Sequence, residues 1–360
     1  MREPEANPMT VSPPSPYDPD AGASDSGKAS SRRRQPRIVL LGMGGTIASS
    51  AGVATQLHDY TVTDTVEAVL AAVPQAHELA DIRCEQLANI DSHAIDNAML
   101  LQLARRAEAI LQDPEVDGLV ITHGTDTLEE TAYFLNLTLK SAKPVVLVGA
   151  MRPATALSAD GPLNLHNAIR LAACAEASGM GVLVMLNDRI GAARYVTKAS
   201  TTVTDAFRSF EHGNLGEIAG SVVYLFNTPT RLHTLATDFS LAAIDELPHV
   251  DILYDYQGAG SHLYRAAIDA GARGIVLAAT GNGSLSPAAR LGAELATQRG
   301  VMFVRSSRVG QGVVTSLADD ESLGLVAAGS LNPQKARVLL MLALGRTRDF
   351  RLIQGYFDRY

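Results

Sequence analysis

Short apolar runs typical of buried strands alternate along this chain with longer stretches that have the apolar spacing of an amphipathic helix. Strands that are apolar throughout need cover on both faces, and a helix between two strands makes them parallel. The pattern predicts an α/β fold with a doubly wound, mostly parallel sheet. Asp64, three residues before Glu67, is expected to cap the first helix. The expected strands are 38–41, 119–122, 144–148, 181–186, 250–253, 274–278 and 302–304, and the expected helices are 64–73, 96–112, 128–139, 163–177 and a last one opened by Asn332-Pro333.

Changes in composition divide the chain into four segments. Residues 1–36 are rich in Pro, Ser, Asp and Ala and hold few large apolar side chains, so we expect a disordered tail. Segment 226–248 is polar at its start and carries a proline near each end, which is typical of a linker. The sequence therefore predicts a larger N-terminal α/β domain at 37–225 and a smaller C-terminal parallel-sheet domain at 249–360.

Charge and composition exclude several classes of protein. The formal charge of −8 disfavours a nucleic-acid surface, which needs clustered Lys and Arg. No apolar run reaches the ~18 residues of a membrane helix. The first 20 residues lack a basic segment followed by an apolar one, so a signal peptide is not expected and a cytoplasmic location is; a misassigned start would allow a periplasmic one. Two cysteines, Cys84 and Cys174, are too few for a disulfide framework.

The loop after the first expected strand is glycine-rich and ends in a threonine. In an open parallel sheet, ligands bind at the carboxyl ends of the strands. The segment Gly42-Met43-Gly44-Gly45-Thr46 fails as a dinucleotide-binding loop, because that motif needs glycine where Ile47 stands. The glycines instead allow the backbone to approach a ligand closely and present Thr46. Taken alone, Thr46 is better explained as a structural turn residue.

A second polar loop, at 122–127, follows another expected strand. Its Thr125 and Asp126 suit a helix cap when taken alone, and Lys198, near a third strand, suits a surface charge. Placed together with Thr46 and a tyrosine, for which Tyr60 is a candidate, they suffice for acyl transfer by an activated hydroxyl. No His-Glu-x-x-His, Cys-x-x-Cys or Gly-x-Ser-x-Gly motif is present, so neither a metal, a cofactor nor an α/β-hydrolase is expected. The scattered histidines are interpreted as structural or surface residues.

Six segments, in this order and spacing, resemble the bacterial-type L-asparaginases, and within them the type II group. The resemblance covers roughly residues 37–360 and implies two α/β domains assembled as a homotetramer of intimate dimers. The segments that carry it are Gly44-Gly45-Thr46-Ile47-Ala48, the run from Thr122 to Thr131, Val148-Gly149-Ala150-Met151-Arg152-Pro153, Ser158-Ala159-Asp160-Gly161-Pro162, Gly281-Asn282-Gly283 and the run from Leu331 to Arg337.

The resemblance implies a role for each of five residues. Thr46 resembles the nucleophile that attacks the amide carbon and carries a β-aspartyl ester, and Tyr60 resembles the tyrosine of a mobile flap that supports this hydroxyl. Thr125, Asp126 and Lys198 resemble a second triad. In that triad Thr125 positions the attacking water or transfers a proton, Lys198 adjusts Thr125, and Asp126 holds the substrate ammonium. Which threonine attacks first is the open alternative, and Thr46 is favoured.

Substrate-binding residues are implied in the same way, with two departures from the family pattern. Ser92 resembles the serine that binds the α-carboxylate, and Asn282 resembles a residue contributed by a neighbouring subunit. His93 stands where the family commonly has Gln or Glu. The family glutamate that follows a Ser-Ser-Arg segment is missing after Arg308. Asp319, Asp320 and Glu321 are the candidates to replace this glutamate.

The residues and the resemblance together indicate an enzyme that hydrolyses L-asparagine to L-aspartate and ammonia through a threonine ester. Asparagine and glutamine differ by one methylene, so a glutaminase-asparaginase of mixed specificity is an alternative. A related subunit that releases ammonia for tRNA amidation is disfavoured by the charge of −8. A non-catalytic amino-acid-binding protein on the same scaffold is a further alternative, although it has no need of Thr46 or Lys198.

Overall fold

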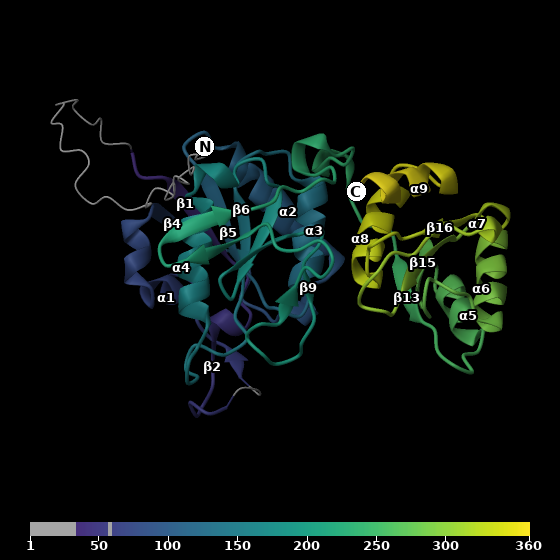
Figure 1. Cartoon of the computed structure of the whole chain (residues 1–360), viewed down its shortest axis with the longest axis horizontal. Helices are drawn as coiled ribbons and strands as arrows, with labels where there is room; N and C mark the ends of the chain where they lie inside the picture. Colours follow the sequence, from purple (N-terminus) through teal and green to yellow (C-terminus); the bar gives the residue numbers. More distant parts are fainter. Residues whose placement is uncertain (1–33, 57–59) are drawn as a thin grey trace, which may run out of the picture. The chain divides into compact units, whose positions relative to one another are not determined.

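The computed structural model describes residues 34–56 and 60–360 (Figure 1). Most of the expected tail, residues 1–33, lies outside the described residues. The first strand, β1, begins at Arg37, one residue earlier than predicted. Two sheets follow along the chain, and helices cover both faces of each, as the alternation of strands and helices predicts.

The larger sheet has eight strands in the order β12-β11-β8-β7-β6-β5-β1-β4. The strands from β7 to β4 in this order are parallel, and β8, β11 and β12 extend the sheet in antiparallel fashion. The antiparallel edge was not predicted. It begins at the tight turn Asn187-Asp188, where both residues have positive φ (51° and 61°), as a two-residue hairpin requires. The bounds are β1 Arg37–Gly42, β4 Asp81–Gln86, β5 Gly118–Thr122, β6 Val145–Val148, β7 Val182–Leu186, β8 Arg189–Ala192, β11 Gly216–Ala219 and β12 Val222–Leu225.

Alternate side chains of the parallel strands enter two separate hydrophobic cores. On β1, Val39 and Leu41 belong to one core and Ile38 and Leu40 to the other. Helices α2 (Asn97–Gln112) and α3 (Leu128–Thr138) cover the first face, and α1 (Val66–Ala71) and α4 (Gly161–Ala172) cover the second. This two-sided burial explains why the strands are apolar throughout.

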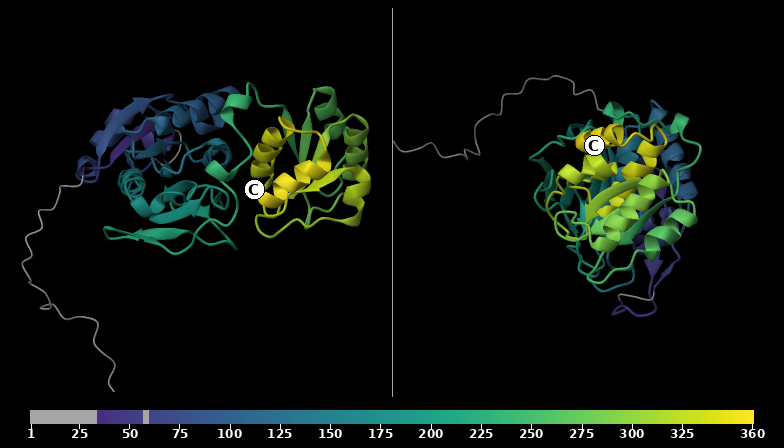
Figure 2. Two further views of the ribbon diagram at one scale, coloured as in Figure 1. Left: turned by 90° about the horizontal axis from the view of Figure 1, so that it is seen from above. Right: turned by 90° about the vertical axis from the view of Figure 1, so that its right-hand side faces the viewer.

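The smaller sheet is fully parallel, in the order β13-β14-β15-β16. Helices α5 and α6 build a core on one of its faces, and α8 packs on the other, where it also contacts α3 of the larger sheet (Figures 1 and 2). The elements are β13 Val250–Tyr254, α5 His262–Asp269, β14 Gly274–Ala279, α6 Pro287–Gln298, β15 Met302–Ser307, α7 Ala318–Leu323, β16 Leu325–Ala327, α8 Pro333–Leu344 and α9 Phe350–Arg359.

Two short hairpins lie outside the main sheets. Strands β2 (Ser49–Ser50) and β3 (Thr61–Val62) pair antiparallel, as do β9 (Thr197–Lys198) and β10 (Phe207–Arg208). Neither hairpin contains the continuous apolar run that marks a buried strand, so the sequence analysis did not resolve them. Both carry candidate site residues, because Tyr60 adjoins β3 and Lys198 lies in β9.

Several local predictions need correction. Thr65, not Asp64, caps α1, and its side chain accepts from the Ala68 amide at 3.4 Å. Helix α4 ends at Ala172 rather than at 177. The helix opened by Asn332 is not the last, because α9 follows it. The predicted cap of α8 is confirmed, since Asn332 accepts from the Lys335 amide. Helix α2 is capped by Asp96, which accepts from the Met99 amide.

The segment predicted as a linker packs against the larger sheet's helices through a lysine. The Lys140 ammonium donates to the carbonyls of Thr234 at 2.9 Å and Thr237 at 2.7 Å. The segment includes two short 3-10 turns, Thr234–Ala236 and Leu241–Ala243. Irregular backbone is held here by polar contacts, which explains its polar composition.

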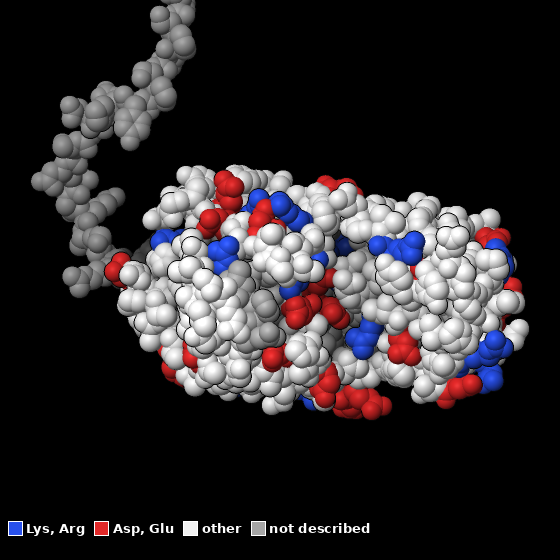
Figure 3. Space-filling view, turned by 90° about the horizontal axis from the view of Figure 1, so that it is seen from below, with Lys and Arg blue, Asp and Glu red and all other residues white. Residues whose placement is uncertain are grey.

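The described surface mixes the two signs of charge. Acidic and basic side chains are interspersed on the face shown in Figure 3, in line with the net charge of −8. Within residues 34–56 and 60–360, no helix combines the length and apolar character that a bilayer crossing requires.

Candidate active site

The two threonine loops leave neighbouring parallel strands at the same edge of the larger sheet. Strands β1 and β5 pair in parallel register, with Gly42 opposite Thr122. The loop after β1 leads into a 3-10 turn at Thr46–Ala48, and the loop after β5 leads through Thr125 into α3. The edge expected to bind a ligand therefore carries both predicted hydroxyls.

A backbone-to-backbone contact between glycines brings these loops together. A Cβ atom on Gly45 would lie 2.3 Å from the Cα and N atoms of Gly124, so no other residue fits. Gly44 and Gly45 also have φ of 91° and 83°, which side chains rarely adopt. Gly45 directly precedes Thr46, and Gly124 directly precedes Thr125. The sequence analysis assigned these glycines to the approach of a ligand; the structure uses Gly45 for the contact with the neighbouring loop.

Thr46 and Tyr60 form the first pair of hydroxyls. Their oxygens are 2.8 Å apart, and Thr46 is only 5% exposed. The β2–β3 hairpin explains the pairing, because β2 follows the turn that holds Thr46 and β3 follows Tyr60 directly. Ser50 lies opposite Thr61 in this hairpin, which places the adjacent Tyr60 near Thr46.

Lys198 joins the two members of the second group. Its ammonium donates to Thr125 Oγ1 at 2.9 Å and to Asp126 Oδ1 at 2.6 Å. The Lys198 side chain is 17% exposed, whereas that of Asp126 is 62% exposed. One oxygen of the Asp126 carboxylate therefore pairs with the lysine, while the carboxylate still faces solvent. Asp126 and Lys198 also line one surface depression.

Ser92 lies against the second loop. Its hydroxyl oxygen accepts from the backbone amides of Asp126 at 3.2 Å and Thr127 at 3.3 Å, and the side chain is buried. A Cβ on Gly124 would lie 2.8 Å from this oxygen, so Gly124 permits this approach too. Because the serine oxygen only accepts in these contacts, its own proton is left to donate. His93 follows in the same turn and is exposed.

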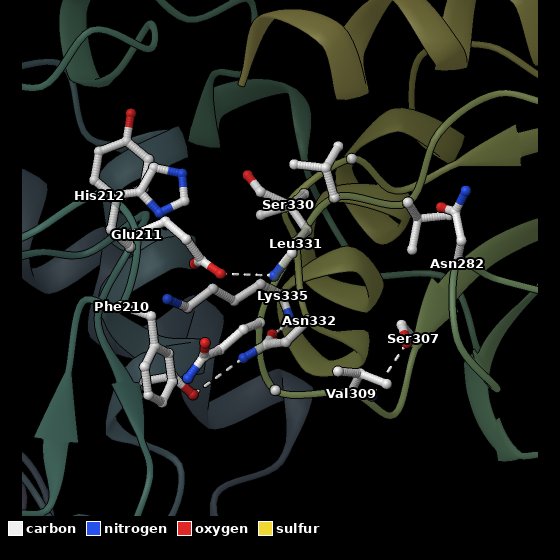
Figure 4. A pocket seen from close by; sticks show the side chains of 18 of the residues that line it. Phe210, Glu211, His212, Asn282, Ser307, Val309, Ser330, Leu331, Asn332 and Lys335 are labelled. Carbon is white, nitrogen blue, oxygen red and sulfur yellow. Dashed lines mark hydrogen bonds between the residues drawn. The ribbon is translucent and has the colours of Figure 1, made fainter.

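Asn282 belongs to the smaller sheet, and its amide contacts Thr315 rather than the residues above. It donates to Thr315 Oγ1 and accepts from the Thr315 amide, both at 2.8 Å. Arg305, which is fully buried, donates to the carbonyls of Gly283 at 2.9 Å and Thr315 at 3.0 Å. The arginine thus holds both segments of this contact, the loop after β14 and the loop before α7. Asn282 lines a separate cavity of about 250 Å³, shown in Figure 4.

The three acidic residues considered as replacements for the family glutamate already have partners. Each pairs with an arginine near the smaller sheet, and Asp320 is buried against Arg305. These carboxylates serve the packing around α7. The pairs are Asp319 with Arg290, Asp320 with Arg305 and Glu321 with Arg351.

Two residues of the site were missed in the sequence analysis. His123, treated there as structural or surface by default, is fully buried between the two strand ends. Its Nδ1 donates to the Gly124 carbonyl at 2.7 Å, and burial lowers its pKa to about 4, so the ring is neutral. Glu129, in the first turn of α3, is 3% exposed and accepts from the backbone amide of Lys198. A charged residue within an otherwise buried helix is the signal that marks Glu129.

Metal ligands do not gather among the described residues. Between residues 34 and 56 and between 60 and 360, no group of three or more His, Cys, Asp or Glu side chains forms a candidate metal site. The polar side chains that meet at the site are hydroxyls, one ammonium and one exposed carboxylate.

Comparison with protein families assigns the class. A family model described as "Asparaginase, N-terminal" matches residues 37–231, and one described as "Glutaminase/Asparaginase C-terminal domain" matches residues 249–357. The fold and these two matches define the protein as an amidohydrolase. The chain belongs to the asparaginase family.

Individual relatives agree over nearly the whole chain. L-asparaginase 2 of Bacillus subtilis (strain 168) is 54% identical over 93% of this chain and 89% of the relative. L-asparaginase 2 of Escherichia coli (strain K12) is 46% identical over 90% and 93%. The glutaminase-asparaginase of Pseudomonas fluorescens biotype A is 41% identical over 94% of both chains. The crystal structure of a probable cytoplasmic L-asparaginase from Campylobacter jejuni superposes with a TM-score of 0.89 at 46% identity, covering 91% of this chain and 100% of that one.

The glycine contact yields a first prediction. In Gly45→Ala the new methyl group collides with the Gly124 backbone, so the loops must separate and the two threonines with them. A displacement of about 1 Å costs ~10²-fold in rate, and we expect at least that loss in ammonia release. Gly310→Ala, where a Cβ meets nothing within 4 Å, is the control. Wild-type activity in Gly45→Ala would show that the loop contact is dispensable.

Burial of His123 yields a second prediction. Its pKa is lowered from 6.5 to about 4, so between these values the unfolded chain binds a proton and the folded protein does not. The free energy of unfolding therefore falls as the pH falls, by about 2 kcal/mol between pH 7.5 and 5 from this group. We expect His123→Asn to lose that part of the decrease, measured by urea unfolding at both pH values. The exposed His77→Gln should keep it. An unchanged decrease in His123→Asn would contradict this explanation.

Proposed function

We propose that this protein is an L-asparaginase that hydrolyses the side-chain amide of L-asparagine to L-aspartate and ammonia, a reaction of asparagine catabolism. The relatives named L-asparaginase 2 support the substrate. The observation that carries the mechanism is that two loops in backbone contact each hold a hydrogen-bonded threonine hydroxyl. Thr46 is paired with the Tyr60 hydroxyl, and Thr125 is paired with the Lys198 ammonium.

In the first step, Thr46 Oγ1 attacks the amide carbon. The Tyr60 hydroxyl, 2.8 Å away, relays the threonine proton toward the leaving nitrogen. Ammonia departs as the β-aspartyl ester forms on Thr46. Backbone amides near Thr125 stabilise the negative charge that develops on the carbonyl oxygen.

In the second step, water attacks the ester. Thr125 Oγ1 accepts from the Lys198 ammonium, so its own proton and lone pair are oriented for a water molecule. The ester bond breaks, Thr46 regains its proton, and aspartate is released. Lys198 fixes Thr125 as well as the carboxylate of Asp126.

The two charged ends of the substrate need separate partners. The Asp126 carboxylate is exposed and keeps one oxygen free of Lys198, so it accepts the substrate ammonium. The Ser92 hydroxyl donates to the α-carboxylate, and His93 lies beside it. Asn282 of a neighbouring subunit completes the site in a homotetramer of two intimate dimers, with the subunits built from domains at 37–225 and 249–360. A cytoplasmic location remains part of this proposal.

A mixed glutaminase-asparaginase is the second candidate, because a relative with that name is 41% identical over 94% of the chain. The two substrates differ by one methylene, which is worth roughly 1–3 kcal/mol in discrimination. A non-catalytic amino-acid-binding protein has no use for the paired hydroxyls.

Removal of the nucleophile tests the function directly. We expect Thr46→Ala to release ammonia from L-asparagine at least ~10³-fold more slowly than wild type, because no other group forms the ester. Thr63→Ala removes an exposed hydroxyl from the neighbouring segment and should remain active. If Thr46→Ala kept full turnover, Thr46 would not be the nucleophile; if wild type released no ammonia, the binding protein would be favoured.

His93 provides a test of selectivity. Its imidazole ring is bulkier near the substrate's charged end than the Gln of the family pattern, so we expect it to lower glutamine turnover. His93→Gln should raise the ratio of glutamine to asparagine kcat/KM by several-fold, within the ~10–200-fold that one methylene can discriminate. Steady-state ammonia release with both substrates measures the ratio. An unchanged ratio removes His93 from selectivity.

A further inference from the structure

Glu129 is a buried carboxylate that receives hydrogen bonds from both lobes of the protein. It lies in the first turn of α3 and is only 3% exposed. Its Oε2 accepts from the Lys198 backbone amide at 2.7 Å. Its Oε1 accepts from Asn332 Nδ2 at 2.9 Å and Gln334 Nε2 at 2.7 Å, both of which belong to the start of α8.

Burial of this charge is costly and needs these donors. A buried carboxylate is tolerated when its oxygens are satisfied by N–H groups, and such charge-assisted bonds are stronger and more directional than neutral ones. The nearby Lys335 ammonium interacts favourably with this carboxylate. Burial lowers the pKa of Lys335 to about 8, and the negative charge of Glu129 opposes that decrease. An apolar side chain at position 129 would avoid the cost of burying a charge, but it would accept none of these three hydrogen bonds.

The N-terminus of α8 gives Glu129 a fixed orientation. Asn332 caps α8, because its Oδ1 accepts from the Lys335 amide at 3.0 Å. The cap directs the opposite side of the amide, Nδ2, to Glu129 and to Thr197 Oγ1 at 3.2 Å. Figure 4 shows Asn332 and Lys335 at this end of the helix. Both Thr197 and Lys198, the whole of β9, are therefore held from α8 and α3.

Strand β9 is short and depends on its neighbours for its position. It is two residues long and pairs with the equally short β10, where Lys198 lies opposite Phe207. The flanking residues add a bond from the Ala199 amide to the Ala206 carbonyl at 2.7 Å and one from the Lys335 ammonium to the Val196 carbonyl. The ammonium of Lys198 must nevertheless lie within hydrogen-bond distance of Thr125 and Asp126 at once.

We propose that Glu129 is a positioning residue for Lys198, which holds the lysine's main chain so that its ammonium stays on Thr125 and Asp126. The smaller lobe takes part, because Asn332 and Gln334 orient Glu129. This inference rests on the proposed role of Lys198 in the hydrolysis of the ester. Glu129 itself does not touch the substrate.

The test is a double-mutant cycle between Glu129 and Lys198. Glu129→Gln keeps the shape but directs an amide N–H at one of three donors, so the Lys198 main chain shifts. We expect kcat for L-asparagine to fall about 10–100-fold with KM changed less than threefold. In the Lys198→Met background the same change should have almost no further effect, because a residue that acts through Lys198 loses its role when the ammonium is absent.

A second readout separates positioning from general damage. If the water step depends on the placement of Lys198, the ester on Thr46 should accumulate in Glu129→Gln, as in Lys198→Met, in intact-protein mass spectra of quenched turnover. Glu130→Gln is the matched control, because it removes a largely buried carboxylate from the next residue of α3. It should leave kcat and the amount of ester unchanged.

The outcomes distinguish this inference from the proposed function. An equal loss from Glu129→Gln in both backgrounds, or a wild-type kcat in Glu129→Gln, would overturn the positioning role even if Thr46→Ala and Lys198→Met each lose most, though not all, of their turnover. Full activity of those two variants would instead overturn the proposed function. If Glu129→Gln does not fold, Gln334→Met carries the test, because it removes one donor and keeps the carboxylate. We then expect a several-fold loss in kcat alone, and an unchanged kcat would refute the contribution of the smaller lobe.

Discussion

The close contact of Gly45 with Gly124 is the constraint on which the site depends. Adjacent strands lie about 4.8 Å apart within the sheet, and side chains on the loops that leave them would keep the loop backbones apart. Here the backbones meet, because a Cβ on Gly45 would come within 2.3 Å of Gly124. Since Thr46 follows Gly45 and Thr125 follows Gly124, this contact brings the two threonines to neighbouring positions at the edge of the sheet.

The charges of the site are divided by exposure. Asp126 is largely exposed and Glu129 is sealed, yet both contact Lys198, one through the ammonium and the other through the main chain. An exposed carboxylate can exchange water for a charged ligand at little cost, whereas a sealed one keeps a single arrangement. The main chain of Lys198 is thereby fixed by a buried carboxylate, while its ammonium contacts a carboxylate that faces solvent.

The sequence was sufficient to predict the strand-end loops, because apolar runs, glycines and helix caps are local signals. It did not predict contacts between distant segments. Lys198 reaches Asp126 across 72 residues, and Asn332 reaches Glu129 across 203, with no periodic pattern to indicate either. The family resemblance named Lys198 and Asp126 but gave no account of how a two-residue strand holds the lysine. The antiparallel edge was missed because its strands are only four residues long and the outer two are half exposed. Helix α9 was missed although Asp349 caps it, accepting from the amides of Arg351 and Leu352.

The smaller lobe contributes to the site by two rigid devices rather than by loose contact. One is the capped start of α8, which orients Glu129 through Asn332 and Gln334. The other is the buried Arg305, whose guanidinium binds Asp320 and the carbonyls on either side of the Asn282–Thr315 contact. Removing one partner of a buried ion pair leaves an uncompensated charge and costs about 3–5 kcal/mol, so this arrangement does not yield to a ligand. Because Asp320 is committed to Arg305, it is not available to replace the family glutamate, and the exposed Asp126 remains the proposed partner of the substrate ammonium. The same commitment restrains the Asn282 loop, so the orientation of the Asn282 amide is set by contacts within this chain.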